Sequence, residues 1–200
     1  PLKVEIWYPA IVPAGKKELA SYEDSFGSRL DSTRPLLPFT FPGRALRDAA
    51  ADLKSAAFPL VIVSHGYPGS RVLLSYLTEN LASKGYVVVA IDHTESTHAD
   101  QQGFPSTLLN RPKDILFILN QIAEAGQPVS NSFLSGLVDA NNTALIGYSM
   151  GGYGVMNVGG AGYSDKLGGF FSSMTGGSKA IATRTANHAA FTASIDPRIK

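Results

Sequence analysis

The chain has 200 residues, no cysteine and a formal net charge of +1, from 17 basic and 16 acidic residues. This length suits a single domain, and 44% apolar residues can build a sizeable core, which excludes global disorder. The absence of cysteine excludes a disulfide scaffold, a thiolate metal site and a cysteine nucleophile. We find no block of basic residues that would favour a nucleic-acid partner, and no apolar run of about 18 residues that would span a membrane.

The N-terminal quarter contains one clear strand signal. Residues 2–8 alternate apolar and polar side chains as far as Pro9, which predicts a half-buried strand near a sheet edge. Residues 10–58 show no sustained period and are rich in proline and aromatic residues. We therefore expect a long covering loop over 10–58, with a short helix at 44–54.

The middle of the chain alternates buried strands with helices. Continuous apolar runs at 60–63 and 86–91 predict strands that are buried on both faces, and the run at 144–148 predicts a third, short strand. Helical periods cover 70–85 and 112–126, the second with a proline in its expected first turn. Strands and helices that alternate at this spacing predict the α/β class, with a mainly parallel sheet and helices on both faces.

The C-terminal quarter carries weaker signals. Residues 159–180 form a Gly/Ser-rich excursion, 182–193 predict a helix, and 196–200 resemble the approach to another strand. With nothing complete after the strand at 144–148, that strand would leave an open apolar edge, which is a template for aggregation. We therefore expect residues 1–200 to form one domain that is incomplete at its C-terminus, the N-terminal part of a larger fold.

A serine stands at the turn between a predicted strand and a predicted helix. The segment Gly147-Tyr148-Ser149-Met150-Gly151 fits the pattern G-x-S-x-G. A tight turn pushes the serine hydroxyl out of the sheet, and glycines two positions before and after it remove Cβ atoms that would collide. A helix N-terminus at Ser149 also favours developing negative charge. We predict that Ser149 is a nucleophile; the alternative is an ordinary glycine-rich turn.

A second loop lies at the carboxyl end of an earlier predicted strand. It reads Ser64-His65-Gly66-Tyr67-Pro68-Gly69. A serine presented in this way uses two backbone N–H groups as an oxyanion hole, one from the following residue and one from such a loop. That assigns the N–H groups of Tyr67 and Met150, whereas His65 is expected to orient the loop.

Several segments together resemble the α/β-hydrolase superfamily. The chain is similar to bacterial serine esterases related to platelet-activating-factor acetylhydrolase, often labelled predicted dienelactone hydrolase. Dienelactone hydrolases themselves use a cysteine nucleophile, which this chain lacks. The Gly66-Tyr67 and Ser149-Met150 pairs also resemble those of cutinase-like polyester hydrolases. The segments that carry the resemblance are 4–9, 64–69, 90–94, 110–115, 147–152 and 196–200.

The partners of the serine are harder to place. In this fold the chain order is serine, then acid, then histidine. Asp165 and His188 follow Ser149 in that order, but neither stands at the carboxyl end of a predicted strand. We therefore expect the acid and the histidine of the triad beyond residue 200, supplied by the remaining C-terminal polypeptide, with Asp165 and His188 as the in-chain alternative.

Two further histidines lie near the expected catalytic edge. His93 and His98 follow the strand at 86–91 and precede the serine, which is the wrong order for the base. They either line or support the pocket or have no special role. Together with Asp92 their spacing is too irregular for a metal site, so we expect no metal and no cofactor.

The leading interpretation is a serine carboxylic-ester hydrolase of the esterase, lipase or polyesterase type, which acts through an acyl-enzyme. Its substrate would be a small-molecule or polymeric ester. One alternative is a non-catalytic α/β-hydrolase-like binding module, which would not need a strained serine turn; another is an amide or lactone hydrolase. The sequence assigns no compartment, although a secreted or periplasmic location is slightly favoured.

Overall fold

The computed structural model describes residues 1–15, 19–101, 103–161, 169–170, 172–173, 177 and 195–200. In chain order its elements are β1 (Lys3–Trp7), β2 (Ser21–Phe26), β3 (Leu37–Pro42), β4 (Phe58–Ser64), α1 (Ser75–Ala82), β5 (Val87–Asp92), α2 (Phe104–Ala125), β6 (Val138–Gly147) and α3 (Met150–Val158).

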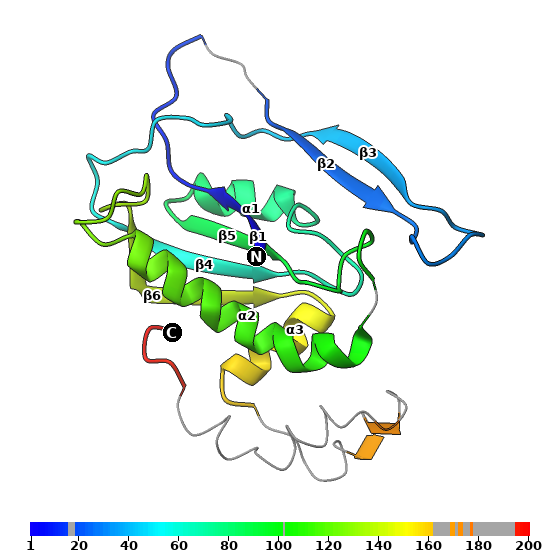
Figure 1. Ribbon diagram of the computed structural model, residues 1–200. Coiled ribbons are helices and arrows are strands. Elements are labelled where there is room, and N and C mark those ends of the chain that lie inside the picture. The colour runs from blue at the N-terminus through cyan, green and yellow to red at the C-terminus, as the bar shows by residue number, and fades with distance from the viewer. Residues whose placement is uncertain (16–18, 102, 162–168, 171, 174–176, 178–194) are drawn as a thin grey trace.

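Four strands form the main sheet in the order β1-β5-β4-β6 (Figure 1). β4 pairs in parallel with β5 on one side and with β6 on the other. β1 pairs antiparallel with β5 at an edge of this sheet. The predicted mainly parallel sheet and the edge position of the first strand are therefore confirmed. The three parallel strands end at the same edge, where Ser64 lies opposite Gly147 and Ile91.

The two faces of the sheet bury separate hydrophobic clusters. Successive side chains of a strand point to opposite faces, so β4 serves both. Leu60 and Ile62 pack with α2 and α3 on one face, and Val61 and Val63 pack on the α1 side. Each fully buried side chain of this size contributes about 1.5–3 kcal/mol. Helices therefore cover both faces, as the sequence predicts (Figure 1).

The last described residues lie beside the middle of β6. The Thr143 N–H donates to the carbonyl of Arg198 at 2.8 Å, and the Lys200 N–H donates to the carbonyl of Thr143 at 3.0 Å. These bonds form a parallel bridge between Thr143 and Ile199. The approach to a further strand, expected at 196–200, is thus found next to β6. The helix expected at 182–193 and most of the excursion at 159–180 lie outside the described residues.

The long segment before β4 is more ordered than the sequence predicts. β2 and β3 form an antiparallel hairpin in which Tyr22 lies opposite Phe41. The helix expected at 44–54 is wrong, because the backbone of this segment bonds to other elements. The N–H groups of Arg44 and Ala45 donate to the Glu79 carboxylate, and the Asp52 N–H donates to the Pro9 carbonyl. The first N–H groups of a helix have no intrahelical acceptor in any case, but the bond from Asp52 and the left-handed φ of 53° at Asp48 are incompatible with a helix through this segment.

Helix α2 begins at Phe104, about two turns before the predicted start, so Pro112 lies inside it. An internal proline leaves the carbonyl four residues earlier without its helical donor. Here that carbonyl belongs to Leu108, and the hydroxyl of Tyr153 on α3 donates to it at 2.9 Å. A tertiary contact thus replaces the bond that Pro112 removes. α1 differs in the other direction, since it begins at Ser75 rather than at Ser70.

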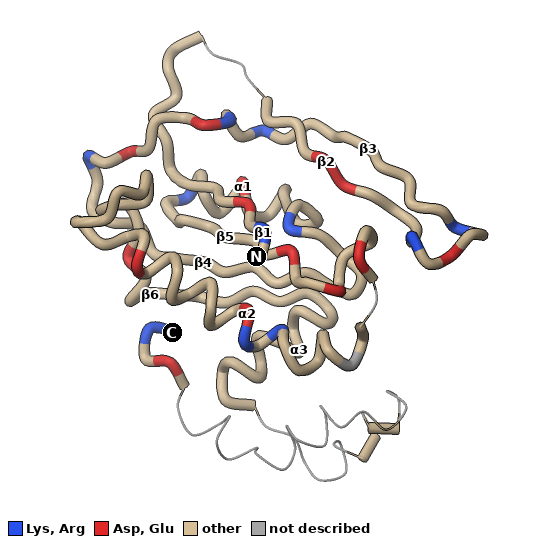
Figure 2. The backbone as a smooth tube through the Cα atoms, in the orientation of Figure 1, with Lys and Arg blue, Asp and Glu red and all other residues tan. Residues whose placement is uncertain are grey.

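Basic and acidic residues are intermingled along the described chain, without a large region of one sign (Figure 2). Within the part of the chain that the structure describes, no helix has the length and apolar character needed to cross a bilayer.

Candidate active site

Ser149 occupies a strained turn between β6 and α3. Its backbone has φ 53° and ψ −117°, a left-handed φ that costs a non-glycine residue on the order of 1–3 kcal/mol. The two glycines of the motif make this turn possible. A Cβ on Gly147 would lie 2.3 Å from the Gly151 carbonyl oxygen, and one on Gly151 would lie 1.9 Å from that of Ser64. The Ser149 side chain is exposed.

The turn aims Ser149 at the start of a helix. α3 begins at Met150, and the Ser149 hydroxyl makes no capping bond to it. The first N–H groups of a helix have no intrahelical acceptor and carry a partial positive charge. The hydroxyl is therefore exposed beside donors that favour an anionic oxygen. This is the local structure that the G-x-S-x-G pattern predicts.

The loop after β4 lies directly against this turn. A Cβ built on Gly66 would stand 3.5 Å from the Cβ of Ser149 and 3.2 Å from the Tyr148 ring. The Tyr148 N–H also donates to the Ser64 carbonyl at 3.0 Å. The fold thus brings the 65–69 loop, which contains Tyr67, next to Ser149. The Tyr67 ring meets Phe104 of α2 edge-on, with 5.3 Å between ring centroids.

His65 holds the 65–69 loop in place. Its side chain is buried, and Nδ1 lies 2.6 Å from the Gly66 carbonyl oxygen. Nε2 accepts the backbone N–H of His93 at 3.2 Å. A carbonyl can only accept, so Nδ1 carries the proton and the ring is neutral. Burial, then the neighbouring His93 and Arg111, lowers the His65 pKa to about 3. Both ring nitrogens are occupied, so His65 is a structural residue.

Beneath the loop runs a buried hydrogen-bonded chain. Arg111 Nη1 donates to Ser64 Oγ at 3.2 Å. Ser64 Oγ lies 2.9 Å from His93 Nε2, and His93 Nδ1 lies 2.8 Å from Asp114 Oδ2. Each group can donate to the next: the guanidinium to the Ser64 hydroxyl, that hydroxyl to His93 Nε2, and His93 Nδ1 to the Asp114 carboxylate. The chain has the residue types of a catalytic triad, but Ser64 is 0% exposed within β4. It therefore holds the sheet edge together rather than meeting a substrate.

Burial shifts the pKa values of the groups in this hydrogen-bonded chain. Burial is the main cause that raises the Asp114 pKa to about 6, against the opposing effect of Arg111. Burial, with the charge of Arg111, lowers the pKa of His93 well below its ordinary value. The Arg111 pKa falls to about 10 for the same reason, so the guanidinium stays charged at neutral pH. The buried cation is thus linked through neutral groups to a carboxyl group.

The other polar residues near the sheet edge are bound to different partners. His98 Nδ1 lies 2.8 Å from the Gly27 carbonyl, and its ring meets Phe26 of the hairpin edge-on. Asp92 accepts from Arg71 at 2.6 Å. His93 and His98 both line a cavity of about 350 Å³, of which Ser149 is not a lining residue. Among the described residues, no group of three His, Cys, Asp or Glu side chains could hold a metal ion.

The in-chain acid and histidine candidates, Asp165 and His188, lie outside the described residues. Asp196 is described and pairs with Arg198 at 2.5 Å.

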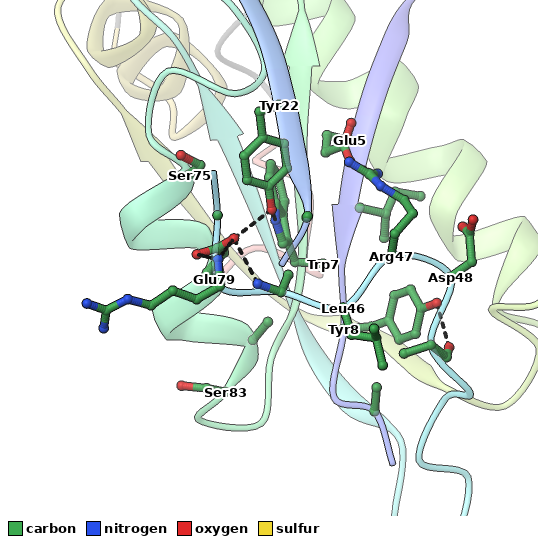
Figure 3. A pocket seen from close by; sticks show the side chains of 18 of the residues that line it. Glu5, Trp7, Tyr8, Tyr22, Leu46, Arg47, Asp48, Ser75, Glu79 and Ser83 are labelled. Atoms are coloured by element: carbon green, nitrogen blue, oxygen red, sulfur yellow. Dashed lines mark hydrogen bonds and ion pairs between the residues drawn. The ribbon is translucent and has the colours of Figure 1, made fainter. Parts of the chain in front are cut away.

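A larger cavity, of about 1460 Å³, lies along the β1 edge of the sheet, among β1, the 42–51 segment and α1. Several of the side chains that line it bind one another (Figure 3). Glu79 accepts from the Tyr22 hydroxyl at 2.7 Å, and the Trp7 indole donates to that hydroxyl at 2.7 Å. Arg47 pairs with Glu5. The Arg47–Glu5 pair attaches the 42–51 segment to β1, and Ser149 is not among the lining residues.

Sequence reasoning missed the roles of Ser64, Arg111 and Asp114. A signal for Arg111 existed, because it stands in line with Leu108, Ile115 and Ile122 at helical spacing. A charged residue in an otherwise apolar stripe is almost never buried without partners. Its partners come from β4, the 65–69 loop and the loop after β5, which no helical period reveals.

Comparisons with known proteins identify the family of the chain. A family model described as PET hydrolase-like matches residues 50–167. Curated relatives include cutinase est1 of Thermobifida alba, 33% identical over 49% of this chain and 29% of its own length. Cutinase 2 of Thermobifida cellulosilytica is 31% identical over 49% of this chain and 33% of its own length. The matches thus span about a third or less of the length of these relatives.

A solved ferulic acid esterase from Streptomyces cinnamoneus is 24% identical, with a TM-score of 0.42, and covers 74% of this chain and 57% of that chain. The family match extends over β4, β5 and β6 of the sheet, the 65–69 loop and the Ser149 turn. It confirms the predicted resemblance to cutinase-like polyester hydrolases and the predicted α/β-hydrolase fold. The chain belongs to the PET hydrolase-like family.

Proposed function

We propose that the protein is a serine hydrolase of carboxylic esters, with Ser149 as its nucleophile. The observation that carries this proposal is the Ser149 turn. A solvent-exposed serine is held at φ 53° by two glycines that no larger residue could replace. Such strain persists only where the surrounding structure enforces it, and it is concentrated at functional sites. The curated relatives named as cutinases support an ester as the substrate class.

In the proposed reaction Ser149 Oγ attacks the ester carbonyl carbon while its proton passes to a base. The N–H groups of Tyr67 and Met150 hold the oxyanion that forms. The bond from carbon to the leaving oxygen then breaks, and the base returns the proton to that oxygen. Water attacks the acyl-enzyme in the same way and releases the acid and free Ser149.

The base belongs, in this proposal, to a histidine outside the described residues. His65 and His93 each have both ring nitrogens hydrogen-bonded to protein groups. His98 is tied to Gly27 of the hairpin. That leaves His188, or a histidine of further polypeptide, to reach the Ser149 hydroxyl. His188 does not stand at the carboxyl end of a predicted strand, which favours a histidine of further polypeptide.

The surroundings of Ser149 favour an ester with an apolar acyl or aryl group. Tyr148 is 56% exposed and its ring lies over Gly66, beside the serine. Tyr67 extends the aromatic surface on the other loop and rests against Phe104. Aromatic faces of this kind bind apolar groups well. Small esters and ester polymers both fit this description.

The test is covalent labelling of the protein with a fluorophosphonate, followed by mass spectrometry of the labelled peptide. We expect one label, on Ser149. The Ser149→Ala variant should take up no label and should hydrolyse a p-nitrophenyl ester at least about 10⁴-fold more slowly, as when a triad member is lost. Ser83→Ala, at an exposed serine after α1, is the matched control and should behave as the wild type.

Other outcomes separate the alternatives. A protein that binds an apolar ester but takes no label and turns over no ester is a binding module, and the proposal is then wrong. Faster turnover of an anilide than of the matched ester would assign an amide hydrolase instead. Labelling of any serine other than Ser149 would remove Ser149 as the nucleophile.

A further inference from the structure

We infer that Arg111 is a positioning residue, which aims the Tyr67 N–H by holding the carbonyl of the preceding residue. This inference rests on the proposed function, because it concerns the oxyanion hole of Ser149. It assigns a role to a buried cation on α2 that neither the motif nor the triad chemistry requires.

The guanidinium of Arg111 reaches three segments at once. It is 0% exposed. Nη1 donates to the His65 carbonyl and to Ser64 Oγ. Nη2 donates to the Gly66 carbonyl at 3.2 Å and to the hydroxyl of Ser96. A planar fork with several donors is suited to bind carbonyls at a fixed angle, which a lysine ammonium is not.

The Gly66 carbonyl matters because of the peptide that it belongs to. The same rigid plane carries the Tyr67 N–H. This peptide is trans, since the cis bond recorded in this loop follows Tyr67 rather than preceding it. In a trans peptide the C=O and N–H bonds point in opposite directions. A carbonyl fixed toward the buried guanidinium therefore fixes the N–H to point away from it, on the outer side of the loop.

Two donors hold this one carbonyl oxygen. His65 Nδ1 donates at 2.6 Å and Arg111 Nη2 at 3.2 Å. The backbone of the loop is also attached farther along, where the Gly69 N–H donates to the Ser96 carbonyl at 3.1 Å. Ser96, in the loop after β5, thus contacts the 65–69 loop through its carbonyl and Arg111 of α2 through its hydroxyl. Rotation of the 66–67 peptide would break both bonds to the Gly66 oxygen.

Gly66 lies beside the turn that presents Ser149. A Cβ on Gly66 would lie 3.5 Å from the Ser149 Cβ. On this inference the Tyr67 N–H points toward that turn, away from the buried guanidinium. Loss of the guanidinium should leave the substrate contacts intact but weaken the donor that acts on the transition state.

The test compares an oxygen ester with its thionoester in the Arg111→Met and Arg111→Lys variants. Sulfur is larger than oxygen and accepts hydrogen bonds weakly, so the thionoester gains little from an oxyanion hole. Loss of one such donor lowers kcat by about 10²–10³. We expect the oxygen ester to lose at least about tenfold in kcat with KM nearly unchanged, and the ratio of oxygen-ester to thionoester rates to fall.

Leu119→Ala is the matched control, because it leaves a cavity two turns along the same helix without touching the loop. It should lower stability but keep the ratio of the two rates. Equal losses for both esters in the Arg111 variants, or no loss, would overturn the inference. Failure of both variants to fold would assign Arg111 to the stability of the core and overturn it too. Hydrolysis that survives Ser149→Ala contradicts the proposed function instead.

Discussion

Gly151 packs so tightly against Ser64 that a Cβ on Gly151 would lie 1.9 Å from the Ser64 carbonyl oxygen. Real Cβ atoms do not approach a backbone oxygen so closely. The contact joins the first turn of α3 to the end of β4. It therefore sets how near the Ser149 turn can come to the 65–69 loop.

Substitution of Gly151 by alanine should accordingly be severe. Either the start of α3 or the end of β4 must move, and we expect the free energy of unfolding to fall by about 3 kcal/mol or more. Gly152→Ala is the matched control, because its Cβ would meet nothing closer than 3.5 Å. Urea unfolding of the two variants measures the difference. Equal stability of the two proteins would contradict the tight contact.

The Tyr153–Leu108 hydrogen bond should be coupled to Pro112. Tyr153→Phe removes the donor to the Leu108 carbonyl, which we expect to cost about 1–3 kcal/mol. Pro112→Ala restores a helical N–H to the same carbonyl. The loss on Tyr153→Phe should therefore be smaller in the Pro112→Ala background. A double-mutant cycle of unfolding free energies checks this, and additive effects would show that the two residues act independently.

Acid should destabilise the protein through its buried histidines. The pKa values of His65 and His93 are lowered in the folded state, so the unfolded chain takes up protons first as the pH falls below about 6.5. Asp114 acts in the opposite sense between about pH 4 and 6, because its raised pKa keeps a proton on the folded state. Two groups against one leave a net loss of stability as the pH falls through that range.

Urea unfolding at pH 5 and pH 6 measures this slope. His65→Gln can replace both hydrogen bonds of the imidazole without titrating, so it should flatten the dependence. Stability that is unchanged or higher at pH 5 in the wild type would show that the two histidines are not held neutral.

Glu79 should hold the 42–51 segment on the core. Its carboxylate accepts from the N–H groups of Arg44 and Ala45 and from the Tyr22 hydroxyl (Figure 3). Glu79→Ala leaves these donors without an acceptor, so amide hydrogen exchange in 43–51 should accelerate by at least about tenfold, with the rest of the sheet unaffected. Ser83→Ala, in the same cavity, is the control. Unchanged exchange in 43–51 would show that other contacts hold the segment.

Local signals in the sequence predicted the structure correctly where that structure depends on neighbouring residues alone. The apolar run at 60–63 and the Ser149 motif both describe structure that forms within a few residues. The helix expected at 44–54 failed because the backbone there bonds to the segment after β1: the Asp52 N–H donates to the Pro9 carbonyl, and the Ala50 carbonyl accepts from the Ile11 N–H. The early start of α2 escaped prediction because a distant hydroxyl, that of Tyr153, satisfies the carbonyl that Pro112 leaves free.

The sequence by itself determined the parallel sheet, the strand-to-helix turn at Ser149 and the family. Periodicity and glycine spacing are properties of neighbouring residues, so a single chain displays them. Only the tertiary structure decided that Arg111 lies beneath the 65–69 loop and that Ser64, His93 and Asp114 are bonded to one another. Their positions depend on which strand ends meet at one edge of the sheet, and that follows from strand order and crossovers rather than from any local pattern.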